Sequence, residues 1–122
     1  MKPEKKDSKP GVRLRVVLGP DVALGPGKVA MLEEIEATGS IAAAGRNMGM
    51  SYKRAWYLVE TMNRCFKRPV VAATKGGRSG GGAVLTPLGA EVLARYRRME
   101  KLAAKAVRNE MGKLRKALVD LP

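Results

Sequence analysis

The chain contains no histidine and a single cysteine, Cys65, among its 122 residues. The absence of histidine excludes His-dependent catalytic triads and His-ligated metal ions. One cysteine cannot form an internal disulfide, which favours a reducing cytoplasm as the location of the protein. Cys65 lies beside the apolar face of a predicted helix, where a buried structural thiol is more common than a nucleophile. We therefore expect no catalysis, no cofactor and no metal.

Acidic residues and long apolar runs are also scarce. The 11 Asp and Glu oppose 24 Lys and Arg, so the net charge is +13 and the isoelectric point is near 10.4. Such a surplus disfavours a compact chain unless a polyanion neutralises it, and nucleic acid is the usual polyanion. The alternative is a generally basic protein whose lysines only aid solubility. No apolar run approaches the roughly 18 residues of a membrane span. The charged N-terminus also has no apolar signal region, so we expect a soluble protein that is not exported.

The most informative segment, residues 38–57, has the pattern of a helix-turn-helix. Gly39 is placed to end one helix and Ser40 to cap the next, while Gly49 breaks the chain for a short turn. Ser51 can then cap a third helix, whose first turn carries polar and basic side chains. In a helix-turn-helix, this turn reads base edges in the DNA major groove. The exposed side chains of the third helix are expected to be Tyr52, Lys53, Arg54, Tyr57 and Arg64.

The sequence before residue 87 suits one DNA-binding domain over residues 12–86, preceded by a flexible basic tail at residues 1–11. Residues 13–18 alternate as a short strand, and residues 19–27 are expected to form a loop. A first helix follows, with Glu33, Glu34 and Glu36 on a solvated face. The second and third helices are expected over about 40–48 and 51–66. The apolar residues that should face the core are Val29, Leu32, Ile35, Ala55, Leu58, Val59, Met62 and Phe66.

Two short strands, residues 70–74 and 83–86, are predicted after the third helix. Between them lie residues 75–82, with five glycines, two cations and a serine. This loop is too long for a two-residue turn and suits a mobile hairpin tip. A hairpin in this position is the wing of a winged helix domain, and Lys75 and Arg78 could contact phosphates or the adjacent minor groove. The alternative is a flexible connector whose cations are merely solvated.

Residues 87–122 are predicted to form one long helix that begins at Thr86-Pro87. A helix of about 33 residues spans about 50 Å, whereas a domain of this size is about 35 Å across. The helix must therefore overhang the domain, kink at Gly112, or pack on another subunit. We expect a homodimer, paired along an apolar stripe that includes Val92, Tyr96, Met99, Ala103, Val107, Met111 and Leu114. The first helix and residues 13–18 would assist this pairing.

Together these patterns predict a mainly α protein with a small β wing, a winged helix-turn-helix followed by a long C-terminal dimerisation helix. The expected partner is double-stranded DNA. The glycine loop lacks the Gly-Lys-Ser/Thr ending of a phosphate-binding loop, which argues against nucleotide binding. The candidate DNA-binding residues are Ser40, Ser51, Tyr52, Lys53, Arg54, Tyr57, Arg64, Lys75 and Arg78.

Residues from about 31 to 102 resemble the N-terminal DNA-binding domain of the ModE family, the molybdate-responsive bacterial transcription regulators. The resemblance is carried by Thr38-Gly-Ser-Ile41, Met50-Ser-Tyr-Lys-Arg-Ala-Trp56, Met62-Asn63, Gly76-Gly-Arg-Ser-Gly-Gly-Gly-Ala-Val-Leu-Thr86 and Leu88-Gly89. The helix-turn-helix part alone is also similar to LysR-type regulators, a weaker and more generic likeness.

The resemblance implies a winged helix-turn-helix, a homodimer and a pseudo-palindromic operator. Ser51, Tyr52, Lys53 and Arg54 fall on the start of the family's recognition helix, and the glycine loop falls on its wing. Regulators of this family that sense molybdate carry paired small β-barrel domains after the long helix. The sequence ends at Pro122, so we expect no molybdate binding by this chain.

Two other readings of the basic charge remain open. A sequence-indifferent, chromatin-like protein that coats DNA would need the same charge, although a polar, hydrogen-bonding helix start favours specific recognition. The basic C-terminal helix could also lie on anionic lipid, but its stripe has few bulky aromatic residues to insert.

Overall fold

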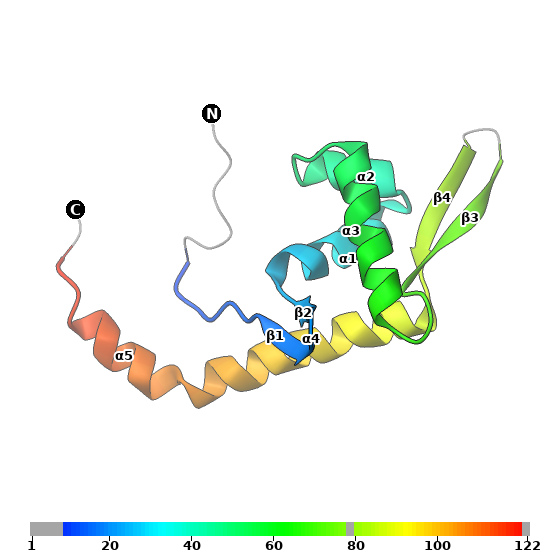
Figure 1. The fold of residues 1–122 in the computed structure, drawn as a ribbon. Helices are drawn as coiled ribbons and strands as arrows, with labels where there is room; N and C mark the ends of the chain where they lie inside the picture. Colours follow the sequence, from blue (N-terminus) through cyan, green and yellow to red (C-terminus); the bar gives the residue numbers. More distant parts are fainter. Residues whose placement is uncertain (1–8, 78–79, 121–122) are drawn as a thin grey trace.

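The computed structural model describes residues 9–77 and 80–120, so most of the expected basic tail lies outside the described residues. Two short β-hairpins and three helices precede a long, broken C-terminal helix (Figure 1). In chain order the elements are β1 (Val16–Gly19), β2 (Val22–Leu24), α1 (Pro26–Thr38), α2 (Ile41–Asn47), α3 (Tyr52–Cys65), β3 (Val71–Gly77), β4 (Gly80–Leu85), α4 (Pro87–Ala106) and α5 (Arg108–Lys116). This order confirms the predicted mainly α winged helix-turn-helix.

The helix-turn-helix forms where the capping residues predict it. The Ser40 Oγ accepts a hydrogen bond from the Ala43 N–H at 3.0 Å, and the Ser51 Oγ accepts one from the Arg54 N–H at 3.1 Å. These capping bonds satisfy N–H groups that the first turn of a helix leaves without partners. Gly39 ends α1 in the left-handed region, at φ 71°. The starts of α2 and α3 are therefore fixed by local sequence.

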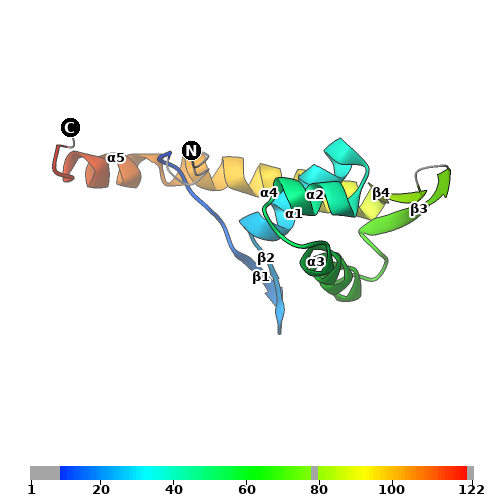
Figure 2. The ribbon, with the colours of Figure 1, turned by 90° about the horizontal axis from the view of Figure 1, so that it is seen from above.

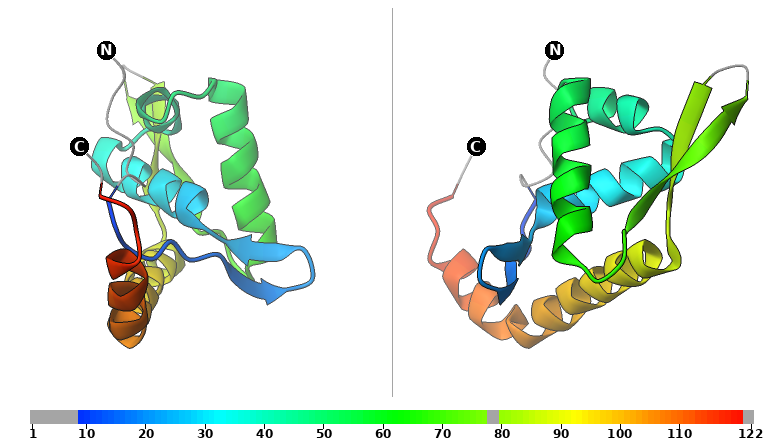
Figure 3. Two further views of the ribbon diagram at one scale, coloured as in Figure 1. Left: turned by 90° about the vertical axis from the view of Figure 1, so that its left-hand side faces the viewer. Right: turned by 45° about the vertical axis from the view of Figure 1, so that its right-hand side comes forward.

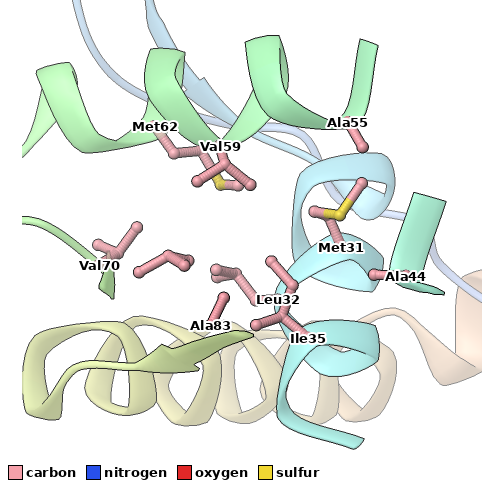
Figure 4. Packing of buried hydrophobic residues seen from close by; sticks show 10 residues of the cluster. Met31, Leu32, Ile35, Ala44, Ala55, Val59, Met62, Val70 and Ala83 are labelled. Atoms are coloured by element: carbon pink, nitrogen blue, oxygen red, sulfur yellow. The ribbon is translucent and has the colours of Figure 1, made fainter. Parts of the chain in front are cut away.

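Helix α1 lies between α3 and α4 and contributes to two clusters of buried side chains (Figure 3, left). Val29 packs with Leu93 and Tyr96 of α4 and with Leu24 of β2. The other cluster, shown in Figure 4, joins α1 to α2, α3 and the start of the wing. Its members are Met31, Leu32, Ile35, Ala44, Ala55, Val59, Met62, Val70, Val71 and Ala83. The predicted inward faces of α1 and α3 are thus confirmed.

The N-terminal hairpin differs from the prediction. Residues 19–27 were expected to be a loop, but Val22–Leu24 forms strand β2, antiparallel to β1, with Val16 paired to Leu24. Asp21 occupies the left-handed region at φ 59°, as tight turns often require. A strand of three residues is too short to show alternation, so the pattern alone could not reveal it.

The wing is longer than predicted. Strands β3 and β4 continue through the glycines until Gly77 pairs with Gly80, with a register shift between Thr74 and Gly77. The expected eight-residue loop is therefore wrong. Glycine weakens a strand but does not remove its backbone donors and acceptors, so the ladder can continue without side chains.

The C-terminal helix breaks at Val107 and not at Gly112, where a kink was one of three alternatives that the sequence left open. Val107 has φ −101° and ψ 4°, between Ala106 at the end of α4 and Arg108 at the start of α5. No residue of α5 is buried. A β-branched residue is a weaker helix former than the alanines before it. In the parts of the chain that the structure describes, no helix is both long and apolar enough to cross a membrane.

The structure corrects the prediction that Tyr96 contacts a second subunit. Its side chain is 0% exposed, and its hydroxyl donates to the Leu14 carbonyl at 2.6 Å. Burial raises the pKa of this hydroxyl, so it stays protonated as a donor. Tyr96 therefore joins α4 to the N-terminal segment within one chain, and a second subunit cannot reach it. The stripe residues Val92 and Met99 are also partly covered within the chain.

We expect Gly89→Ala to destabilise the fold, because a Cβ at Gly89 would lie 2.0 Å from the Val70 carbonyl oxygen. Overpacking of this kind costs about 1–3 kcal/mol, which urea unfolding would measure. Gly112→Ala is the matched control. A Cβ there meets nothing within 4 Å, and alanine in a helix is favoured over glycine by about 0.5–1 kcal/mol. Equal stability of the two variants would contradict this account of the α4 contact.

Candidate nucleic-acid interface

The first two turns of α3 present their polar side chains to solvent. Tyr52 is 55% exposed and Tyr57 is 64% exposed, and Lys53 and Arg54 are also exposed. Behind them the buried face of α3, which includes Ala55, holds the helix against α1 and α2. Gly45 permits the close crossing of α2, since a Cβ there would lie 2.9 Å from the Ala55 Cβ. The candidate residues are thus displayed from a rigid base.

The cations at the start of α3 have no acidic partner among residues 9–77 and 80–120. Within those residues, ion pairs join Arg64 to Glu60 at 3.9 Å and Arg95 to Glu91 at 2.8 Å. Arg97 pairs with Glu33 and, at 2.7 Å, with Glu100. Lys53 and Arg54 take part in none of these pairs. Their charge is therefore available to an external anion.

Arg64 differs from the other candidates on α3. It lies ten residues beyond Arg54, which is about 15 Å along a helix, and it faces Glu60. The structure therefore does not bring Arg64 together with the basic first turn. Arg64 can reach only a separate part of a bound duplex.

The first helix is less solvated than predicted. Glu33 accepts a hydrogen bond from the Arg97 guanidinium of α4, and Glu34 accepts one from the Asn47 Nδ2 at 2.8 Å. These two carboxylates therefore connect α1 to α4 and to the end of α2. They do not oppose the charge at the start of α3.

Helices α2 and α3 and both strands of the wing line an open groove of about 350 Å³. Figure 3, right, shows the wing standing next to α2 and α3. Ser40 lies in the groove at the start of α2, and Tyr52 and Trp56 line it from α3. Trp56 is 41% exposed, which is unusual for so large an apolar side chain. Sequence reasoning missed Trp56 as a candidate, although its position four residues after Tyr52 places both rings on one face of the helix.

The wing is fixed to the rest of the domain at its base. Asn63 of α3 accepts hydrogen bonds from the Val70 and Val71 N–H groups, at 2.8 and 3.1 Å, and donates to the Val71 carbonyl at 3.1 Å. On the other strand, the Ala83 N–H donates to the Gly39 carbonyl at 2.9 Å. Asn63 is a second residue that the candidate list missed, because a positioning role leaves no charge signal in the sequence.

The remaining candidates follow from these elements. The hydroxyls of Ser40 and Ser51 accept the capping bonds and can still donate to a phosphate. Lys75 lies on strand β3, and Arg78 lies outside the described residues. In the described parts of the chain, no three His, Cys, Asp or Glu side chains gather as a metal site would need.

Comparison with known proteins shows similarity to several regulators and molybdenum-binding proteins. The molybdenum-pterin-binding protein MopB of Rhodobacter capsulatus is 50% identical over 82 residues, 67% of this chain and 30% of that protein. The molybdenum transport protein ModE of Azotobacter vinelandii is 42% identical over 88 residues, 70% of this chain and 33% of that protein. The DNA-binding transcriptional dual regulator ModE of Escherichia coli K12 is 35% identical over 81 residues, 66% of this chain and 31% of that protein.

The chain thus matches about a third of the length of these relatives, and no protein-family model matches it.

We expect Asn63→Ala to cost about 1–3 kcal/mol of stability, the usual penalty for leaving buried backbone groups without partners. Urea unfolding would measure this cost, and loss of chemical-shift dispersion in the wing amides would locate it. Asn47→Ala is the control, because it removes an exposed hydrogen bond to Glu34 and should cost less than about 1 kcal/mol. A larger cost at Asn47 than at Asn63 would show that Asn63 does not fix the wing.

Proposed function

We propose that this chain, whose N-terminal part is a ModE-like domain, is a DNA-binding transcriptional regulator that recognises a pseudo-palindromic site as a dimer. The observation that carries the proposal is the first turn of α3, where Lys53 and Arg54 are exposed beside a wing and have no acidic partner among the residues that the structure describes. Rigid presentation of uncompensated cations on a recognition helix is what major-groove reading requires.

In this proposal each part of the interface has a role. Helix α3 enters the major groove, where Lys53 and Arg54 can donate to base acceptors such as guanine O6 and N7. Tyr52 and Tyr57 add hydrogen-bonding and apolar contacts. Ser40 and Ser51, at helix N-termini, are suited to the phosphates that fix the register. Lys75 and Arg78 of the wing would meet phosphates or the adjacent minor groove.

The overhanging part of the C-terminal helices supports a dimer. Beyond the domain, Ala103, Val107 and Met111 are half-buried, and Leu114 is 69% and Leu118 67% exposed. Leaving such side chains in water forgoes on the order of 1.5–3 kcal/mol each for the larger ones. A second copy related by a two-fold axis would cover them. It would also place two recognition helices about one DNA turn apart, roughly 34 Å, as an inverted repeat requires.

The rival proposal is a sequence-indifferent protein that coats DNA. Competition binding separates the two, because a regulator should prefer its own site over random DNA by about 10³-fold or more. Selection of bound sequences from a random pool would supply the site. That residues 1–122 bind no molybdate also remains a prediction.

We expect Lys53→Ala and Arg54→Ala to reduce specificity, whereas Lys75→Ala and Arg78→Ala should reduce affinity in general. Each loss of a base contact costs about 1–3 kcal/mol on the preferred site and less on random DNA. Loss of a phosphate contact weakens binding to both DNAs by similar factors. Titration of both duplexes with all four variants would measure this, and equal losses throughout would favour the coating protein.

We expect sedimentation at micromolar concentration to give twice the monomer mass of 13.1 kDa. Leu114→Asp combined with Leu118→Asp should halve that mass without unfolding the domain, because both side chains are exposed within one chain. Val84→Asp, which alters an exposed apolar residue of the wing, is the control and should leave the mass unchanged. A mass near 13.1 kDa for the unaltered protein at every concentration would reject the dimer.

A further inference from the structure

Helix α4 carries a second basic surface, away from the recognition helix. Arg98, Lys101 and Lys105 are all exposed, and with Ala94 they recur at spacings of four, three and four residues, which places them on one helix face. Together with Arg97 and Leu102 they line a shallow groove of about 450 Å³. We call Arg98, Lys101 and Lys105 the outer basic face.

This face points away from the body of the domain. Gly89, Leu93 and Tyr96 are the buried residues of α4, and Lys105 is nine residues beyond Tyr96, which is a rotation of about 180° from it at about 100° per residue. Helix α1 lies between α4 and α3, on the side of the buried residues (Figures 2 and 3). A duplex seated on α3 therefore lies across α1 from the outer basic face.

Among residues 9–77 and 80–120, no acidic side chain neutralises the outer basic face. The two acids of α4 are engaged elsewhere, since Glu91 pairs with Arg95 and Glu100 with Arg97. In the described part of the chain, Arg98, Lys101 and Lys105 form no ion pair. Solvated helix faces usually alternate the two signs of charge, whereas this face carries one sign only. The start of α3 and the outer basic face are thus two separate basic surfaces of the domain.

We propose that the outer basic face binds the phosphate backbone of a second segment of duplex DNA, while α3 and the wing hold the first. The three cations cover about 10 Å along the helix axis. Each strand of a duplex presents a phosphate about every 3.4 Å along its axis, so the face can meet about three phosphates. Contacts of this kind carry no sequence information, so the second segment can have any sequence. One dimer can therefore hold two DNA segments together.

The test is capture of a second duplex. A duplex that carries the preferred sequence, obtained by selection from the random pool, is immobilised and saturated with protein. A labelled duplex of unrelated sequence is then added at low salt. We expect the unaltered protein to capture the labelled duplex. The triple variant on α4, with Arg98→Gln, Lys101→Gln and Lys105→Gln, should capture at least about tenfold less of the labelled duplex. The slope of log capture against log salt should fall by up to about 2.7, which is about 0.9 per phosphate contact. Affinity for the immobilised site should change little.

The matched control removes the same charge from α5, through Lys113→Gln, Arg115→Gln and Lys116→Gln, all exposed positions. It should keep most of the capture. Equal losses in the two triple variants would overturn the proposal, because the effect would then be one of total charge. Full capture by the α4 variant would also overturn it. If that variant captured DNA normally but bound vesicles containing phosphatidylserine less well, the proposal would again be wrong, because the face would bind lipid and not DNA.

This inference and the proposed function fail in different ways. If no sequence is preferred over random DNA, the proposed function fails, and capture can still be measured on an immobilised random duplex. If a preferred site exists but the α4 variant captures normally, only the second surface is rejected. Sedimentation of both triple variants confirms that neither has changed its oligomeric state.

Discussion

The position of α1 between α3 and α4 is the constraint on which the rest of the structure depends. Four side chains of this helix are fully buried, with Val29, Met31, Leu32 and Ile35 at 0% exposure. Val29 faces α4, and the others face α3 and the wing. The end of the same helix, at Gly39, receives a hydrogen bond from Ala83 of the wing. Helix α3, the wing and the C-terminal helix are thus all positioned from one buried element.

The rigid core allows the exposed face of α3 to carry adjacent positive charges whose repulsion disfavours folding. Lys53 and Arg54 are adjacent residues in the first turn of α3, and concentrating charge of one sign raises the self-repulsion of the folded domain. The domain tolerates this because the capping bonds and the buried face of α3 fix the helix independently of its exposed face. The repulsion is relieved only when an anion arrives, so the charge favours binding and not folding.

Much of this arrangement could be predicted from the sequence, and the failures have physical causes. Local signals such as Ser40, Ser51 and the glycine after α1 predict the helix ends, because each acts through its nearest backbone groups. Two of the roles that the sequence did not reveal depend on contacts between residues far apart in the chain. The Tyr96 hydroxyl forms a hydrogen bond with the Leu14 carbonyl, 82 positions away. The Asn63 side chain accepts a hydrogen bond from the Val70 N–H at the base of the wing, beyond the end of α3. Nothing in a period of 3.6 residues distinguishes a tyrosine buried by its own chain from one buried by a second subunit.

The broken C-terminal helix combines two surfaces that would conflict if they shared a face. A two-fold axis through the outer basic face would bring Arg98, Lys101 and Lys105 against their own copies, which like-charge repulsion disfavours. The apolar stripe avoids this conflict, since Ala103 and Val107 lie within about 20° of Tyr96 at about 100° per residue. They therefore continue the buried face of α4 past the end of the domain. The break at Val107 then allows α5 to turn relative to α4. Pairing through the stripe would thus leave the outer basic face of each subunit exposed to solvent, free to bind an anion other than the DNA that we propose binds at α3.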